Sequence, residues 1–206
     1  MIKKACRILA IALSILVGLY PSIYFIIDRK FGLLNSKSEE VLTHVLWNAA
    51  FYVHIIFGGI ALLTGWTQFG EAFRNRHLQR HRQIGKLYVG SVLLSSIAGI
   101  YIGFFATGGI IASLGFICLG ILWFYVTLMA FLMVKKQRIY DHKRFMIYSY
   151  ALCFAAVTLR IWLPILTFAC GDFTTGYVLA SWVCWLPNLL LGILYTRHSP
   201  SHLIRT

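Results

Sequence analysis

The chain has 206 residues, of which 59% are hydrophobic, 16% aromatic and 12% charged, and its formal net charge is +13 at pH 7. A mean hydropathy of +0.76 exceeds what a soluble domain of this size can bury, because soluble surfaces need many charged side chains. The composition therefore excludes a soluble enzyme and predicts an all-α integral membrane protein.

Six apolar runs are each close to the length of about 20 residues that a helix needs to cross a hydrocarbon core. They cover residues 6–27, 44–67, 87–108, 110–134, 145–170 and 177–196. The spacers between them are short and contain no low-complexity tract, and the runs show no internal repeat. Residues 1–206 are therefore predicted to form a single transmembrane domain, one bundle of six transmembrane helices.

The basic residues lie mostly on one side of the membrane if the six runs alternate in direction. That side receives 15 of the 19 lysine and arginine residues, whereas the other side receives Arg29, Lys30 and Lys37. Because basic loops are retained in the cytoplasm, both termini are predicted to be cytoplasmic and the protein to be a multi-pass protein of the inner membrane. The same charges attract membrane lipids. No nucleic-acid partner is expected, since no aromatic platform accompanies the charges.

Arg160 lies inside the otherwise apolar stretch "AVTLRIWLPIL". Counted from an outer boundary near Gly171, it is about 16 Å deep, close to the bilayer centre. A charge at that depth costs at least about 2.5 kcal/mol, so it should face protein or water and have a partner. Pro164 also removes the hydrogen bond to the carbonyl four residues earlier, which belongs to Arg160 itself. A kink and an unpaired acceptor are expected beside the charge.

Two further polar residues lie at a similar predicted depth, within about one helical turn. They are His54 in the second run and Asn188 in the sixth, directly after Pro187. His54 also begins a face of the second run with three-and-four spacing, on which small residues allow close helix approach. That face contains His54, Gly58, Ala61, Gly65 and Gln68.

This group of His54, Gln68, Arg160 and Asn188 has two interpretations. It is either a polar latch that only holds the helices together, or a binding site for a proton, an anion or a quinone headgroup. All six acidic residues lie in loops or at the ends of runs. That distribution argues against cation-coupled transport through a carboxylate relay.

A second group of histidines lies at the cytoplasmic ends of the third and fifth runs. His77 and His81 are four residues apart just before the third run, and His142 comes just before the fifth. If those helices face each other, His81 and His142 can be the two axial ligands of one b-type haem iron, with nearby basic residues binding its propionates. His77 is a further candidate for contact with this cofactor. The alternative is that these histidines simply belong to headgroup-facing loops.

Other metal arrangements fit the sequence less well. Dense positive charge disfavours a zinc ion, and no cysteine completes a site. A second haem would need another histidine pair, but the fourth and sixth runs contain none to match His54, unless Met129 or Met133 serves as a ligand. The pattern thus departs from the cytochrome b561-like haem bundles that it is similar to in layout.

Three stretches together resemble the bacterial predicted-membrane-protein family described as domain of unknown function 2306. The first is the histidine, glycines and glutamine of the second run. The second is "HRQIGK" at 81–86, and the third is "DHKRFMIYSYA" at 141–151, leading into "AVTLR" at 156–160. Tyr148 stands where the family pattern has an arginine. The resemblance covers about residues 45–170 and implies a membrane protein, without implying a reaction.

Three functions remain open on the sequence. The first is a membrane redox or electron-transfer protein that uses one haem or a quinone, with another redox protein as its partner. The second is a small transporter or binding protein for an anionic or lipid-like ligand, and the third is a non-catalytic accessory protein. The redox interpretation is favoured because His81 and His142 match in depth. No hydrolase or transferase motif is present, so any enzyme would be a membrane oxidoreductase component.

Overall fold

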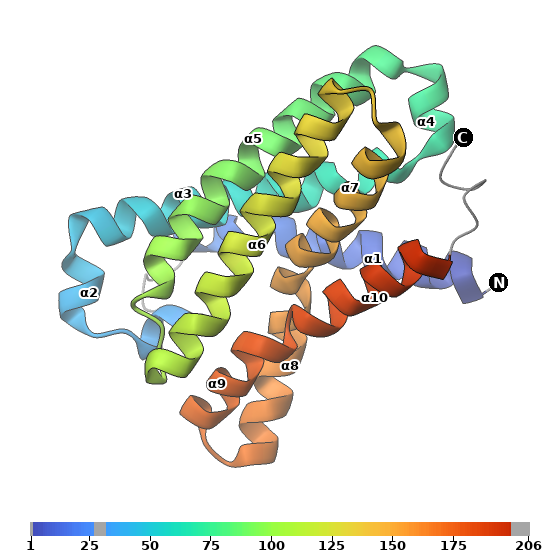
Figure 1. The fold of residues 1–206 in the computed structure, drawn as a ribbon. Helices are drawn as coiled ribbons and strands as arrows, with labels where there is room; N and C mark the ends of the chain where they lie inside the picture. Colours follow the sequence, from blue (N-terminus) through green and yellow to red (C-terminus); the bar gives the residue numbers. More distant parts are fainter. Residues whose placement is uncertain (1, 27–31, 199–206) are drawn as a thin grey trace. The chain divides into compact units, whose positions relative to one another are not determined.

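The computed structural model of the protein describes residues 2–26 and 32–198, and these residues form helices and short connections (Figure 1). Six helices in this part of the chain are long and apolar enough to cross a membrane. They are Lys4–Phe25, Val45–Phe69, Leu78–Gly103, Gly109–Lys135, Ile139–Cys170 and Phe173–His198. The predicted all-helical class and the six long apolar helices are therefore confirmed for the described residues. The chain divides into two compact units, Met1–Ala98 and Gly99–Thr206, and each is described by itself.

The first unit contains α1 to α4 and most of α5. The bounds are α1 Ile2–Leu19, α2 Glu39–Thr43, α3 Val45–Gly65, α4 Glu71–Arg76 and α5 Leu78–Gly103, with 3-10 helices at Tyr20–Phe25, Gly32–Ser36 and Trp66–Phe69. Two glycines let α1 and α3 touch through their backbones. A Cβ built on Gly59 would lie 2.6 Å from the carbonyl oxygen of Gly18, so a larger residue at either position would push the helices apart.

The second unit contains α6 to α10. The bounds are α6 Gly109–Lys135, α7 Ile139–Cys153, α8 Ala155–Cys170, α9 Phe173–Val183 and α10 Leu186–His198. Figure 1 shows α8 and α9 side by side, joined by a short turn. In addition, α6 packs against α7 and α9, and α10 packs against α7. Gly176 makes the α8–α9 contact close, because a Cβ there would lie 2.6 Å from the backbone nitrogen of Thr167.

The helices begin and end at other residues than the apolar runs suggest. α5 begins at Leu78 and α7 at Ile139, although their predicted runs begin at 87 and 145. The added residues include Gln, Arg and Lys, which favour helix and can extend their charged ends toward the headgroups. A helix therefore continues past the end of its apolar run.

The predicted fifth and sixth helices are each divided in two. The first division lies at Phe154, between α7 and α8, and the second at Cys184 and Trp185, between α9 and α10. Pro187 explains the second division, since it has no backbone N–H to continue the helix. By contrast, α8 runs through Pro164 to Cys170, so the break in this helix lies ten residues before that proline.

Candidate functional site

In the first unit, His54 joins α3 to α5 through Ser95. Its Nδ1 lies 2.9 Å from the carbonyl oxygen of Ser95, and the Ser95 hydroxyl donates to the carbonyl of His54 at 2.9 Å. Because a carbonyl can only accept, the Nδ1 of the neutral ring carries the proton and Nε2 is the acceptor. Ser95 is fully buried, so the two residues form a reciprocal clasp inside the unit.

Small residues, together with Gln68 on the 3-10 helix that follows α3, extend this contact with α5. A Cβ on Gly58 would lie 3.2 Å from the Ser95 hydroxyl oxygen, and one on Gly85 would lie 3.1 Å from the Gln68 Oε1. Gln68 is buried, and its Nε2 donates to the Thr67 hydroxyl at 3.1 Å. His54, Gly58 and Gln68, chosen from their spacing, thus lie along one interface, and Ser95 is the partner that the spacing did not indicate.

In the second unit, His142 holds α7 against α6. Its Nδ1 lies 2.8 Å from the carbonyl oxygen of Ala130, and the side chain is half-buried. Two turns further along α7, the Ser149 hydroxyl lies 2.6 Å from the Thr127 hydroxyl, and both side chains are fully buried. The α6–α7 interface therefore fixes the ring of His142 by one nitrogen.

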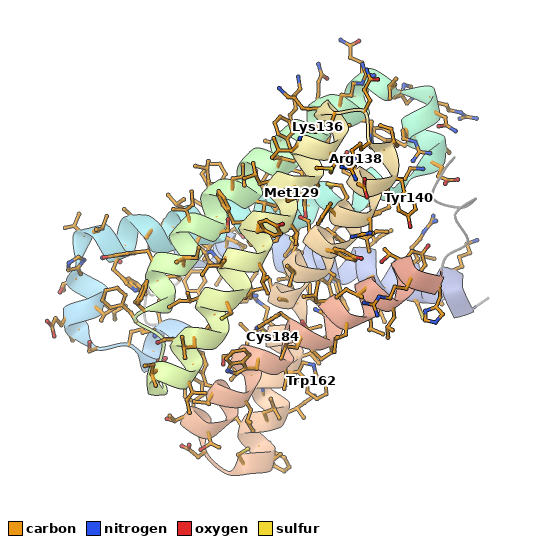
Figure 2. The ribbon with its side chains drawn as sticks, viewed as in Figure 1. Met129, Lys136, Arg138, Tyr140, Trp162 and Cys184 are labelled. Atoms are coloured by element: carbon orange, nitrogen blue, oxygen red, sulfur yellow. The ribbon has the colours of Figure 1, made fainter. Side chains whose placement is uncertain are left out.

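Asn188 links the two divided helices of the second unit. Its Nδ2 donates to the Thr158 hydroxyl at 3.0 Å and to the Cys184 carbonyl at 3.0 Å. The Thr158 hydroxyl donates to the same carbonyl. Figure 2 shows Cys184 where α9 gives way to α10. Thr158 was not predicted from the sequence, because a threonine hydroxyl in a helix can equally bond a carbonyl of its own helix, as the Thr158 hydroxyl also does with that of Phe154 at 3.2 Å.

Arg160 lies on α8, two residues beyond Thr158 and so about 3 Å further along the helix axis. Arg160 and Asn188 thus lie at nearly the same level of the second unit. The Nη1 of Arg160 donates to the carbonyl of Ala156 on its own helix at 2.8 Å. The guanidinium is exposed in this chain.

The other two predicted histidines lie at the junction of α4 and α5. His77 follows α4 with a non-helical backbone, φ −136° and ψ 55°, and its ring contacts that of Phe73 at a centroid distance of 5.9 Å. The backbone N–H of His81 donates to the His77 carbonyl at 2.9 Å. His81 therefore belongs to the first turn of α5, and His77 stands just before it. The pairing of His81 with His142 joins the two units and stays a prediction.

Most metal ions other than haem iron need three or more side-chain ligands. In residues 2–26 and 32–198, no group of three or more His, Cys, Asp and Glu side chains could hold a metal ion. A haem iron held by two histidines needs no such cluster. The haem predicted for His81 and His142 therefore stays a prediction.

The family model described as "Predicted membrane protein (DUF2306)" matches residues 51–196. The chain belongs to this family. The resemblance predicted from the three sequence motifs is thereby confirmed, and the match includes every candidate residue from His54 to Asn188. Comparisons of this DUF2306 protein with curated proteins and with solved structures give no significant match. The likeness in layout to cytochrome b561 stays a prediction.

Proposed function

We propose that this protein is a membrane redox protein that binds one b-type haem, with the Nε2 of His142 as an axial ligand. His81 is the second ligand, as the sequence predicts, and a quinone or another redox protein exchanges electrons with it. The proposal includes an inner-membrane location with both termini in the cytoplasm, which the distribution of basic residues supports.

The observation that carries this proposal is the hydrogen bond between His142 Nδ1 and the Ala130 carbonyl, at 2.8 Å. Metal-ligating histidines almost always donate their second ring N–H to a carbonyl or carboxylate, which fixes the ring and raises its basicity. With the Nδ1 proton engaged, Nε2 is the nitrogen that can bind iron. The buried Ser149–Thr127 pair keeps α6 and α7 in register, so the ring is held before any ligand binds.

Haem would supply reversible one-electron chemistry. The protein would contribute the ring nitrogens, an apolar surrounding and positive charges for the propionates. Lys135 is the last residue of α6, and Lys143 follows His142 on α7. These lysines lie at the ends of apolar helices, where a haem edge can reach charged groups.

The test is an oxidised-minus-reduced absorption spectrum of the protein purified after expression with added haem. We expect a Soret shift with α and β bands of the b type in wild type, lost in His142→Ala and in His81→Ala. The matched control is His198→Ala. His198 also bonds a carbonyl through Nδ1, but that of Leu194 on its own helix at 2.9 Å, and it is exposed. A folded, colourless wild type, or an unchanged spectrum in His142→Ala, would contradict the proposal.

A second candidate is a binding or transport site for an anionic or lipid-like ligand. The observation that favours it is the Thr158–Asn188 hydrogen bond at 3.0 Å between two interrupted helices, almost level with Arg160. Transporters place substrate sites where helices are broken, because helix ends there face a cavity instead of lipid. Arg160 and Asn188 would contact the ligand, with His54 and Gln68 as the further residues that the sequence predicts.

This alternative is tested with oleate as an anionic probe and oleyl alcohol as its neutral counterpart. If the site binds anions, oleate but not oleyl alcohol raises the melting temperature in detergent, and Arg160→Gln abolishes the effect while Arg160→Lys weakens it. Equal responses to both probes would contradict it. If neither probe changes the melting temperature and Arg160→Leu changes only stability, the result would support a non-catalytic accessory protein.

A further inference from the structure

Arg144 on α7 is a partly buried cation on an aromatic surface. Its guanidinium carbon lies 5.6 Å from the ring centroid of Phe145 and 5.9 Å from that of Tyr148. Its Nε is buried, and no hydrogen-bond partner for this atom is found in the described residues. A buried donor of a charged group that lacks an acceptor costs stability, and an anion placed beside it removes that cost.

The chain offers few acids near this arginine. Residues 135–144 contain five basic residues and one acid. They are Lys135, Lys136, Arg138, Lys143, Arg144 and Asp141. Asp141 is already engaged by Arg138, whose Nη2 lies 2.7 Å from a carboxylate oxygen and whose Nε donates to it at 2.8 Å. Figure 2 shows Arg138 and Lys136 together at the turn between α6 and α7. The excess positive charge of residues 135–144 would be offset by an anion from outside this segment.

The Arg144 side of α7 faces α10, whereas the His142 side faces α6. Tyr148, one turn after Arg144, bonds the Thr196 hydroxyl of α10 at 2.7 Å, and Arg197 is the next residue, exposed in the last turn of α10. Residues two apart on a helix are separated by about 200°, so Arg144 points away from the surface on which His142 contacts Ala130. The side of α7 that carries Arg144 is therefore different from the side that carries His142, the proposed haem ligand.

Two long apolar helices end beside this surface, which places it near the level of lipid phosphates if they cross a membrane. Lys135 is the last residue of one apolar helix and Ile139 the first of the next. Arg144 therefore lies about 7.5 Å inside the end of its helix, within reach of a long side chain that extends to the interface. A guanidinium binds phosphate oxygens with two parallel hydrogen bonds, and an aromatic face beside it suits the glycerol and upper acyl chain.

We propose that Arg144, with Arg197 and the Tyr148 ring, binds the phosphate of an anionic phospholipid from the cytoplasmic leaflet. The occupant is a lipid rather than free phosphate, because the site stands at the end of two long apolar helices and includes the rings of Phe145 and Tyr148. An anionic headgroup is required because no described acid offsets Arg144 and Arg197. This inference goes beyond the proposed redox function and stands whether or not haem binds.

The experiment compares full-length wild type with Arg144→Gln in detergent, titrated with phosphatidylglycerol, phosphatidylcholine or inorganic phosphate. Bound lipid is counted by native mass spectrometry, and the melting temperature is followed in parallel. The matched control is Lys136→Gln, which removes the same charge from an exposed position at the same end of the unit. We expect phosphatidylglycerol to bind wild type and Lys136→Gln alike, and Arg144→Gln at least about tenfold more weakly. Arg144→Lys should fall between them, because it keeps the charge without the planar fork.

Three outcomes would overturn the inference. Equal binding of phosphatidylglycerol by Arg144→Gln and Lys136→Gln would show a diffuse charge effect. Equal binding of phosphatidylcholine by wild type would show that the negative charge is irrelevant, and saturation by inorganic phosphate alone would show a site for free phosphate. If Arg144→Gln does not fold, Arg197→Gln provides the comparison, with the same expected weakening relative to Lys136→Gln.

Discussion

Each unit contains a histidine that donates Nδ1 to a carbonyl on a neighbouring helix, but the two histidines are held differently. His54 of the first unit is also engaged by the hydroxyl of Ser95, which returns a hydrogen bond to the His54 carbonyl at 2.9 Å. His142 of the second unit is held by the Ala130 carbonyl, and the hydroxyl pair that stabilises its interface lies two turns away. The two mutual hydrogen bonds of His54 and Ser95 are typical of a residue that joins two helices. By contrast, a single hydrogen bond at Nδ1 fixes the His142 ring and leaves its Nε2 for a ligand.

Replacing each histidine by alanine should give the largest difference between the two units. We expect His142→Ala to lose the haem spectrum completely, because it removes the proposed axial ligand. We expect His54→Ala to keep the spectrum but to melt earlier, since the α3–α5 clasp is lost. Absorption spectra and thermal melting of the two purified variants check both effects. Loss of the spectrum in both variants, with unchanged melting, would remove the distinction between the two histidines.

The close approach of α3 and α5 gives the next largest effect. Gly58→Leu would place a side chain where a Cβ already comes within 3.2 Å of the Ser95 hydroxyl, and overpacking of this kind costs about 1–3 kcal/mol. Gly90→Leu on α5 is the control, because nothing lies within 4 Å of a Cβ at that position. Melting in detergent should separate the two variants. Equal losses would mean that the change acts through helix propensity or lipid contact instead of the clasp.

The paired hydroxyls of Thr127 and Ser149 in the second unit should give a smaller loss of stability, and their two losses should not be additive. Thr127→Val or Ser149→Ala alone should destabilise by about 1 kcal/mol, because the remaining buried hydroxyl loses a partner. The double variant should cost less than the sum of the single changes. A double-mutant cycle measured by unfolding in detergent checks the coupling. Strict additivity would show that the two hydroxyls do not depend on each other.

The smallest effect concerns Asp172, outside the long apolar helices, which begins α9. The Thr175 backbone N–H at 2.7 Å and the Thr175 hydroxyl at 2.9 Å hold the pKa of Asp172 below its usual value. A lowered folded pKa means that the carboxylate stabilises the folded protein above its unfolded pKa and loses this effect as the pH falls through the folded pKa. Melting of wild type should therefore approach that of Asp172→Asn on acidification. A constant gap between the two at all pH values would contradict this account.

The six long helices could be predicted from the sequence because a hydrocarbon solvent admits only long apolar runs with satisfied backbones. Their ends could not, since α5 and α7 continue through basic residues that composition assigns to loops. Of the two helix breaks, the one between α9 and α10 is indicated in the sequence by Pro187. Phe154 carries no comparable signal, so the break between α7 and α8 became visible only in the structure.

The candidate residues could likewise be predicted only in part. His54, Gly58 and Gln68 could be selected from helical spacing, because a face of small and polar residues must meet another helix. Their partners could not, since a carbonyl such as that of Ala130 has no sequence signature. Periodicity also does not say which helix packs against which. Thr158 was missed for the same reason, as its role depends on the position of Cys184 on another helix.

The hydrogen bonds of Thr158 and Asn188 to the Cys184 carbonyl bring the two helix breaks of the second unit to one level. The segment between them, the α8–α9 hairpin, is therefore bounded at both ends by interrupted backbone and held together by its own close contact at Gly176. Such a segment has the properties of a separate cooperative element. Its backbone amides should exchange with solvent deuterium as one group, with the fastest exchange beginning beside Phe154 and Trp185.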